Sequence, residues 1–154
     1  MTKSFFALLG WIGLTFLAPA AGYRARPDTW YARLTKPKFN PPAWVFAPVW
    51  TGLYLAMAVA AWLVWERGGW TAQKLPLALY LAQLLLNAAW TPLFFGAHRI
   101  GLALVDIVLQ WLAIAATFFL FIRVNQFAGW LFVPYLAWVS FAAVLNFNIW
   151  RTNS

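Results

Sequence analysis

Cysteine is absent from the 154 residues, which excludes disulfides, thiolate metal sites and cysteine nucleophiles. Acidic residues are almost absent too: Asp28, Glu66 and Asp106 are the only three, and no two of them lie at helical spacing. This scarcity excludes a pair of carboxylates that acts as general acid and base. The single histidine, His98, cannot form a metal cage or a two-histidine haem clamp by itself. We therefore predict no metal site and no cofactor.

Charged residues of any kind are scarce, at 9%, whereas hydrophobic residues make up 64%. A soluble domain usually has about 25% charged residues, so this chain is predicted to lie in lipid. Its net charge is +8, but the Lys and Arg residues lie between hydrophobic runs, where they anchor helices at lipid headgroups. This placement argues against a nucleic-acid partner.

Five hydrophobic runs are each long enough to cross a bilayer, which takes about 20 apolar residues in a helix. The runs cover residues 5–22, 44–65, 75–95, 100–122 and 127–150. They predict an all-α integral membrane protein, with residues 1–154 forming a single bundle of five transmembrane helices. In an alternative interpretation, the first run is a cleaved signal peptide, because Lys3 precedes it and residues 18–20 resemble a cleavage site.

The long connection between the first two runs, residues 23–43, contains several aromatic residues and four prolines. This composition favours a partly ordered lid over the mouth of the bundle, with Trp30, Arg33 and Lys36 as its main residues, rather than a mobile basic loop. Asn40 is expected to cap the helix that follows.

The Lys and Arg residues divide unequally between the two ends of the predicted bundle. Four belong to the end with the N-terminus and seven to the end with the long connection and the C-terminus: Lys3, Arg67, Lys74 and Arg123 against Arg24, Arg26, Arg33, Lys36, Lys38, Arg99 and Arg151. Because cytoplasmic loops carry an excess of Lys and Arg, residues 23–43 and the C-terminus are predicted to be cytoplasmic.

Polar and small residues mark the faces of membrane helices that point away from lipid. In the third run, Tyr80, Gln83, Asn87 and Thr91 recur at spacings of three and four, which places them on one stripe. Similar stripes in the second and fifth runs predict a pocket with aromatic walls and a few amide groups, suited to a planar polycyclic or sterol-like ligand. The predicted ligand-binding residues on these stripes are Trp50, Tyr54, Gln83, Asn87, Trp90, Tyr135, Trp138, Ala142 and Asn146.

Two further features leave alternatives open. The opposite face of the third run carries Ala78, Ala82 and Ala89, which permit close helix approach either in a homodimer or within one monomer.

In the fourth run, Asp106 should face the bundle, because a carboxylate in lipid is unfavourable by about 2.5–3.5 kcal/mol. It is predicted either to form a hydrogen bond with Asn87, Gln83 or Asn146, or to handle a ligand or a proton.

Five sequence blocks resemble the TspO/MBR family of translocator and tryptophan-rich sensory proteins. The first block is Trp-Tyr-Ala-Arg-Leu-Thr-Lys-Pro at residues 30–37, followed by two prolines at 41–42; the others are residues 47–50, 87–96, 134–138 and 144–151. They occur in order over essentially the whole chain.

The resemblance implies a five-helix bundle, usually a homodimer, that binds porphyrins such as protoporphyrin, sterols and benzodiazepine-type ligands. It implies that the pocket is lined by Trp50, Asn87, Trp90, Ala142 and Leu145. It also implies that Trp50 and Trp138 correspond to the tryptophans linked to light-dependent porphyrin breakdown, which makes them candidate catalytic residues.

Two departures from the family pattern affect the expected ligands. Phe147 and Asn148 occupy the middle of the cholesterol-recognition segment from Leu145 to Arg151, where the family has a tyrosine. Leu102 matches a ligand-contact position that is often tryptophan in the family.

From the residue patterns and the resemblance together, we predict a binding and sensing protein for porphyrins. The alternatives are photo-oxidative porphyrin degradation and a small exporter that uses Asp106 as its proton site.

Overall fold

The computed structural model describes residues 2–153, and all of its regular structure is helical. The helices long enough to cross a membrane are α1 (Thr2–Ala21), α3 (Ala43–Trp65), α5 (Lys74–Thr91) with the π-helical turn η1 (Pro92–Gly96), α6 (Ile100–Val124) and α7 (Gln126–Asn153). Two short helices, α2 (Thr29–Arg33) and α4 (Gly69–Ala72), lie in the connections. These helices confirm the predicted all-α membrane fold, and their bounds agree with the five hydrophobic runs to within a few residues.

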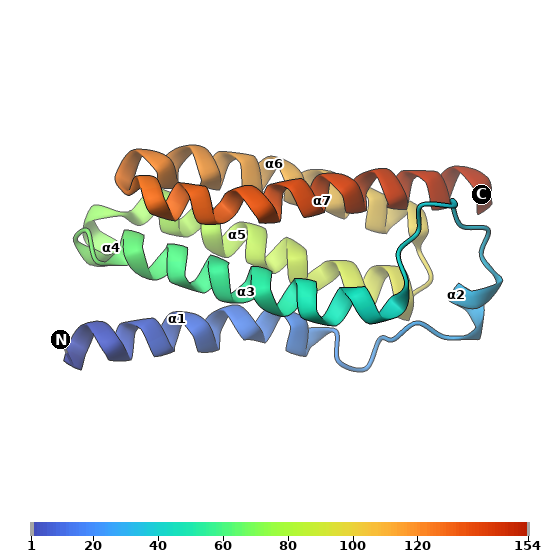
Figure 1. Cartoon of the computed structure of the whole chain (residues 1–154), viewed down its shortest axis with the longest axis horizontal. Helices are drawn as coiled ribbons and strands as arrows, with labels where there is room; N and C mark the ends of the chain where they lie inside the picture. The colour runs from blue at the N-terminus through green and yellow to red at the C-terminus, as the bar shows by residue number, and fades with distance from the viewer. Residues whose placement is uncertain (1, 154) are drawn as a thin grey trace.

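The five long helices lie side by side and alternate in direction (Figure 1). Helix α1 packs on α3 and α5, α3 packs on α7, α7 on α6, and α6 on α5, so that the contacts close a ring. The N-terminus and α4 lie at one end of the bundle, which we call the N-terminal end. The connection 22–42 and the C-terminus lie at the other, which we call the loop end.

The interior of the bundle toward the N-terminal end is filled with aromatic side chains. The ring of Tyr80 stacks on Phe121, with centroids 6.0 Å apart, and Phe132 meets Phe121 edge to face at 5.1 Å. Trp11 of α1 meets the ring of Tyr80 edge to face, with centroids 5.7 Å apart. Because this half of the interior is packed, any space for a ligand has to lie toward the loop end.

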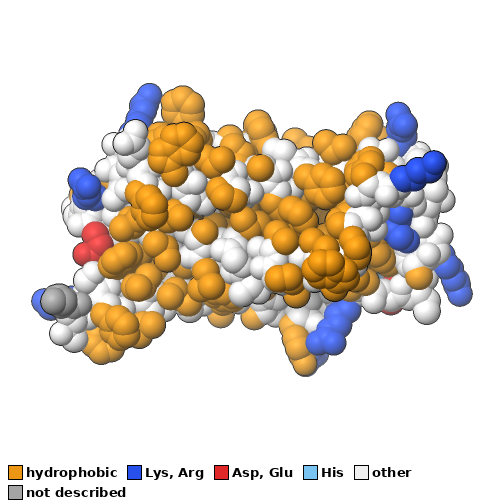
Figure 2. Space-filling view, viewed as in Figure 1, with side chains coloured by type: hydrophobic (Ala, Val, Ile, Leu, Met, Phe, Trp, Pro, Cys, Tyr) orange, Lys and Arg blue, Asp and Glu red, His pale blue; other side chains and the backbone are white. Residues whose placement is uncertain are grey.

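The face of the molecule drawn in Figure 2 is hydrophobic across its middle, and Lys and Arg side chains lie toward its two ends. Large apolar residues such as Phe6 and Leu85 are exposed, which is the arrangement that lipid favours. On α5, Ala78 and Ala82 also face outward, while Ala89 is half-buried. Close packing of Ala78 and Ala82 within the monomer is therefore ruled out.

The start of α3 differs from the prediction. Pro42, rather than Asn40, is the N-cap residue, and it has no side chain that could bond to the first turn. Asn40 makes no hydrogen bond to the first turn of the helix. Its Nδ2 instead lies 3.5 Å from the carbonyl oxygen of Pro41, and its Oδ1 is buried without a hydrogen-bond partner.

Candidate functional site

A cavity of about 680 Å³ opens inside the bundle toward the loop end. Residues of α1, α3, α5, η1, α6 and α7 line it, together with Tyr31 of α2 and several residues of the long connection. Sites for small organic ligands usually enclose about 300–1,000 Å³. The volume is therefore sufficient for a ligand with several fused or linked rings.

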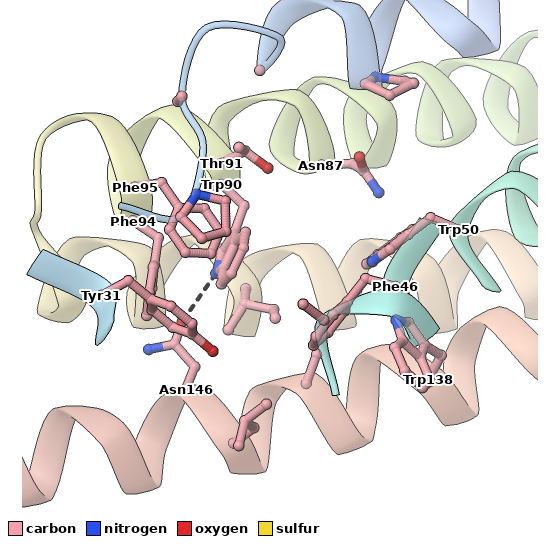
Figure 3. A pocket seen from close by; sticks show the side chains of 18 of the residues that line it. Tyr31, Phe46, Trp50, Asn87, Trp90, Thr91, Phe94, Phe95, Trp138 and Asn146 are labelled. Carbon is pink, nitrogen blue, oxygen red and sulfur yellow. Dashed lines mark hydrogen bonds between the residues drawn. The ribbon is translucent and has the colours of Figure 1, made fainter. Parts of the chain in front are cut away.

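Aromatic side chains form two facing groups on the cavity wall (Figure 3). In one group Trp50 meets Trp138 edge to face, with ring centroids 6.4 Å apart. In the other, Trp90 stacks on Phe94, with centroids 4.9 Å apart and an angle of 21° between the planes. Two aromatic walls with space between them suit a flat, polarisable ligand, because stacked and edge-to-face contacts both become available to its rings.

No charged side chain lines the cavity within the part of the chain that the structure describes. Its side-chain polar groups are amides, hydroxyls and indole N–H groups. The amides and hydroxyls belong to Asn40, Tyr54, Asn87, Thr91, Gln110 and Asn146 among others. The indole Nε1 of Trp138 and the Oδ1 of Asn40, in two of the lining residues, are buried without a hydrogen-bond partner. An uncharged ring system fits this lining, and charged substituents would have to remain at the opening.

Hydrogen bonds fix the inner end of the cavity. Tyr54 donates to Oδ1 of Asn87 at 2.6 Å, and Nδ2 of Asn87 donates to the hydroxyl of Tyr135 at 2.9 Å. That hydroxyl also accepts from Gln110 at 3.0 Å and donates to Oε1 of Gln83 at 2.7 Å. These four bonds join α3, α5, α6 and α7, and they hold Asn87 in place at the inner end.

A second set of bonds holds the indole of Trp90. Its Nε1 donates to Oδ1 of Asn146 on α7 at 2.9 Å, and Nδ2 of Asn146 donates to the carbonyl oxygen of Ile100 at 3.3 Å. The dashed line in Figure 3 marks the first of these bonds. The orientation of the Trp90 ring is thus set by two helices other than its own.

The structure brings eight of the ten predicted ligand-binding residues to the cavity wall: Trp50, Tyr54, Asn87, Trp90, Trp138, Ala142, Leu145 and Asn146. Gln83 and Tyr135 are fully buried beneath the wall and support it through hydrogen bonds. Whether any of them contacts a ligand stays a prediction.

Sequence reasoning missed several aromatic residues of the wall, namely Tyr31, Phe46, Phe94 and Phe95. Phe94 and Phe95 lie in η1, where the turn widens and the backbone N–H of Ala97 bonds to the carbonyl oxygen of Pro92. A stripe extended from α5 at the α-helical period therefore does not predict their direction. Their place in the block 87–96 was the only signal that could have identified them.

The predicted lid contributes to the site through a different residue. Tyr31 lines the cavity, whereas Trp30, Arg33 and Lys36 do not. The ring of Trp30 stacks on His98, Arg33 is exposed, and Nζ of Lys36 donates to the carbonyl oxygens of Tyr31 and Leu34 at 2.8 and 3.1 Å. Lys36 therefore stabilises the C-terminal end of α2.

Asp106 of α6 does not make the predicted hydrogen bonds. The residue is 6% exposed, and its Oδ2 is buried without a partner. The amide nitrogens of Gln83, Asn87 and Asn146, which could donate to it, have other partners. They lie against Sδ of Met57, the hydroxyl of Tyr135 and the carbonyl oxygen of Ile100, respectively. Asp106 is also not part of the cavity wall. The hypothesis of an exporter that uses Asp106 as its proton site stays a prediction.

Comparison with known proteins agrees with the fold and with the sequence blocks. A model of the TspO/MBR family matches residues 5–151. The translocator protein of Homo sapiens is 50% identical over 126 residues, which cover 80% of this chain and 75% of the human one. The translocator protein of Sus scrofa is 43% identical over 150 residues, which cover 92% of this chain and 89% of the Sus scrofa one. The tryptophan-rich sensory protein of Cereibacter sphaeroides is 47% identical over 145 residues, which cover 91% of this chain and 90% of the bacterial one. The chain therefore belongs to the TspO/MBR family.

Proposed function

We propose that this membrane protein binds a porphyrin, such as protoporphyrin, in the cavity between its helices and takes part in sensing, regulating or transporting tetrapyrroles. The observation that carries the proposal is the pair of aromatic walls, Trp50 with Trp138 and Trp90 with Phe94, around a space of about 680 Å³. A porphyrin is a flat aromatic ring system, and it would stack between these walls.

The distribution of charge supports an orientation for this ligand. The cavity lining has no charged side chain in the described chain, so the two propionates of protoporphyrin would not enter it. Seven of the eleven Lys and Arg residues belong to the loop end, where the cavity lies. The propionates would therefore point toward that end and interact with its cations.

Titration of the purified protein with protoporphyrin tests the proposal, with quenching of tryptophan fluorescence as the signal. We expect saturable quenching, and we expect Trp90→Ala to weaken the apparent affinity about ten-fold, because it removes one stacking wall. Trp70→Ala is the matched control, since Trp70 is exposed in α4 at the other end of the bundle. A quenching curve without saturation, or equal losses in both variants, would contradict the proposal.

The same lining suits sterols and benzodiazepine-type ligands, which we propose as competitors for the cavity. Phe147, which replaces the tyrosine of the cholesterol-recognition segment, is 44% exposed on α7, and Leu102 is 48% exposed on α6. Neither lines the cavity. Displacement of protoporphyrin by such a ligand would support a shared site, and simultaneous binding of both would count against it.

The alternative function is photo-oxidative degradation of the bound porphyrin, and the Trp50–Trp138 pair in the wall is the observation that favours it. Such a reaction would use light and oxygen, with these indoles as redox-active groups beside the ring. Illumination of the complex, followed by its absorption spectrum, would separate binding from turnover. We expect slower decay with Trp138→Phe if the enzyme hypothesis is right, and decay equal to that of the wild type counts against it.

Two further proposals concern the whole molecule. We propose that the loop end, with residues 23–43 and the C-terminus, faces the cytoplasm because it has more Lys and Arg residues than the N-terminal end. We also propose that two copies associate through the face of α5 that carries Ala78, Ala82 and Ala89.

A further inference from the structure

His98, in the connection between η1 and α6, has an unusual backbone and close contacts with the long connection. Among residues 2–153 it is the one non-glycine residue with a positive φ, 57°. This left-handed conformation is uncommon for residues other than glycine, so tertiary contacts have to favour it. The imidazole stacks on Trp30 with ring centroids 4.0 Å apart and planes 10° from parallel, and its Nε2 lies 3.4 Å from Oδ2 of Asp28.

Asp28 connects this contact to the cavity wall. Its Oδ1 accepts a hydrogen bond from the backbone N–H of Tyr31 at 3.2 Å, and Asp28 is thereby the N-cap of α2. Tyr31 lines the cavity, and its ring meets Phe95 edge to face at 5.2 Å. The position of His98 is thus linked, through Asp28 and the first turn of α2, to an aromatic side chain of the site.

The other end of this segment is held by neutral groups. The backbone N–H of Thr35 donates to Oδ1 of Asn153, and Nδ2 of Asn153 donates to the carbonyl oxygen of Thr35, both at 2.9 Å. These groups do not change charge between pH 5 and 8, whereas an imidazole does so in this range. Of these two polar attachments of the segment, only the one at His98 involves an imidazole, whose charge can change near physiological pH.

The charges around His98 are few. Asp28 is the charged side chain that faces it from the long connection, and Arg99 follows it in the chain. Arg26 is directed elsewhere, because it lies over the ring of Tyr23 and donates to that residue's carbonyl oxygen. No second ion pair within 4.0 Å occurs between residues 2 and 153.

We propose that Asp28, Trp30 and His98 form a latch that holds α2 over the cavity and closes more firmly when His98 is protonated. Protonation converts the contact with Asp28 into an ion pair and places a cation against the Trp30 ring. We therefore expect the latch to be more stable at acid pH than at alkaline pH.

Asp28 keeps its negative charge in this range. The hydrogen bond from the N–H of Tyr31, with a further contribution from His98, lowers the pKa of the Asp28 carboxyl below its ordinary value. A group with a lowered pKa loses its stabilising charge only as the pH falls through that pKa, which is well below the range in which an imidazole titrates. A pH response near neutrality would therefore not come from Asp28.

The latch itself can be tested without any ligand, by hydrogen–deuterium exchange of residues 29–36 at about pH 6 and pH 8, corrected for intrinsic exchange rates. We expect about two- to five-fold stronger protection at the lower pH, the range typical of exposed ion pairs. His98→Gln should abolish the difference, and His98→Arg should keep the segment protected at both values.

Asp28→Asn separates the two roles of Asp28. Asparagine is as good an N-cap as aspartate but carries no charge, so α2 should form while the pH response is lost. An equal pH response in the wild type, His98→Gln and Asp28→Asn would overturn the proposal.

The consequence for the ligand rests on the proposed porphyrin function. We expect the dimethyl ester of protoporphyrin, which has no carboxylate of its own to titrate, to dissociate about two- to five-fold more slowly at pH 6 than at pH 8. With His98→Gln the two rates should be equal.

If the ester binds but leaves the wild type equally fast at both pH values, the latch does not control the cavity and the proposal is wrong. If the ester does not bind at all, the proposed function fails, and the exchange experiment alone decides the latch.

Discussion

Asn87 is the residue at which the cavity wall meets the hydrogen bonds beneath it. Its Oδ1 accepts from Tyr54 of α3 and its Nδ2 donates to Tyr135 of α7, so both ends of one amide are used between helices. Polar groups within the bilayer have no water to bond with and need partners inside the protein. An amide with a donor and an acceptor can satisfy two hydroxyl groups at once, which an apolar side chain such as leucine could not do.

Replacement of Asn87 tests this role. Asn87→Ala removes one bond from each tyrosine hydroxyl, and we expect the free energy of unfolding in detergent to fall by about 1–2 kcal/mol, the usual effect of such interhelical bonds. Asn148→Ala is the control, because Nδ2 of Asn148 donates only to the carbonyl oxygen of Val144 in its own helix. Thermal unfolding would show the difference, and equal losses for the two variants would mean that the buried bonds do not hold the helices together.

Helices α6 and α7 are joined by Asn125 alone, which makes this the tightest connection between long helices in the described chain. Oδ1 of Asn125 accepts from the backbone N–H of Ala128 at 3.1 Å and so caps α7. Gly129 lies directly against α6, where an added Cβ would come within 2.5 Å of the Cβ of Ile122 and 2.7 Å of its Cα. The short connection requires this close approach, and only glycine permits it.

Gly129→Ala should accordingly destabilise the protein. The new methyl group would meet backbone and a β-branched side chain, so the helices have to separate, and we expect a loss of about 1–3 kcal/mol in the free energy of unfolding. Gly52→Ala on α3 is the matched control, since nothing lies within 4 Å of its added Cβ. The control should be neutral or stabilise the helix by up to about 1 kcal/mol. A neutral Gly129→Ala in thermal unfolding would contradict the packing argument.

At the scale of the whole molecule, the outer face of α5 is the surface proposed for dimer formation. Ala78 and Ala82 are exposed on the isolated chain, and small residues at this spacing allow two helices to approach closely. Ala82→Phe should shift the protein from dimer to monomer in mild detergent, as measured by size-exclusion chromatography with light scattering. Ala137→Phe, on the exposed face of α7, should leave the mass unchanged. A dimer that survives Ala82→Phe argues for another interface.

Membrane orientation can be tested with single cysteines, because the chain has none of its own. Thr29 lies at the loop end and Thr71 at the N-terminal end, both are exposed, and replacing them changes no charge. A membrane-impermeant maleimide should label Thr71→Cys in intact cells and Thr29→Cys only after permeabilisation. The reverse pattern would place the loop end outside the cytoplasm.

The sequence alone was enough to predict the membrane helices. The run 100–122 corresponds to the helix Ile100–Val124, and the run 44–65 corresponds to the helix Ala43–Trp65. Lipid offers the backbone no hydrogen-bond partners, so a long apolar segment forms a helix, in which the backbone groups bond to one another. The stripe of polar residues in the third run also predicted an inward face correctly: Tyr80, Gln83 and Asn87 are all buried. A helical period determines the direction of a side chain, and composition determines which direction avoids lipid.

Only the tertiary structure decided which inward-facing residues line the cavity and which pack against other side chains. Gln83 lies on the same stripe as Asn87 but one turn nearer the filled half, where Tyr80 and Phe121 leave no space. Asp106 has no amide partner because the amides it was expected to meet are bonded elsewhere. The stacking of Trp30 on His98 joins segments far apart in the chain. In each case the outcome depends on side chains contributed by other helices, and a pattern within one segment carries no information about them.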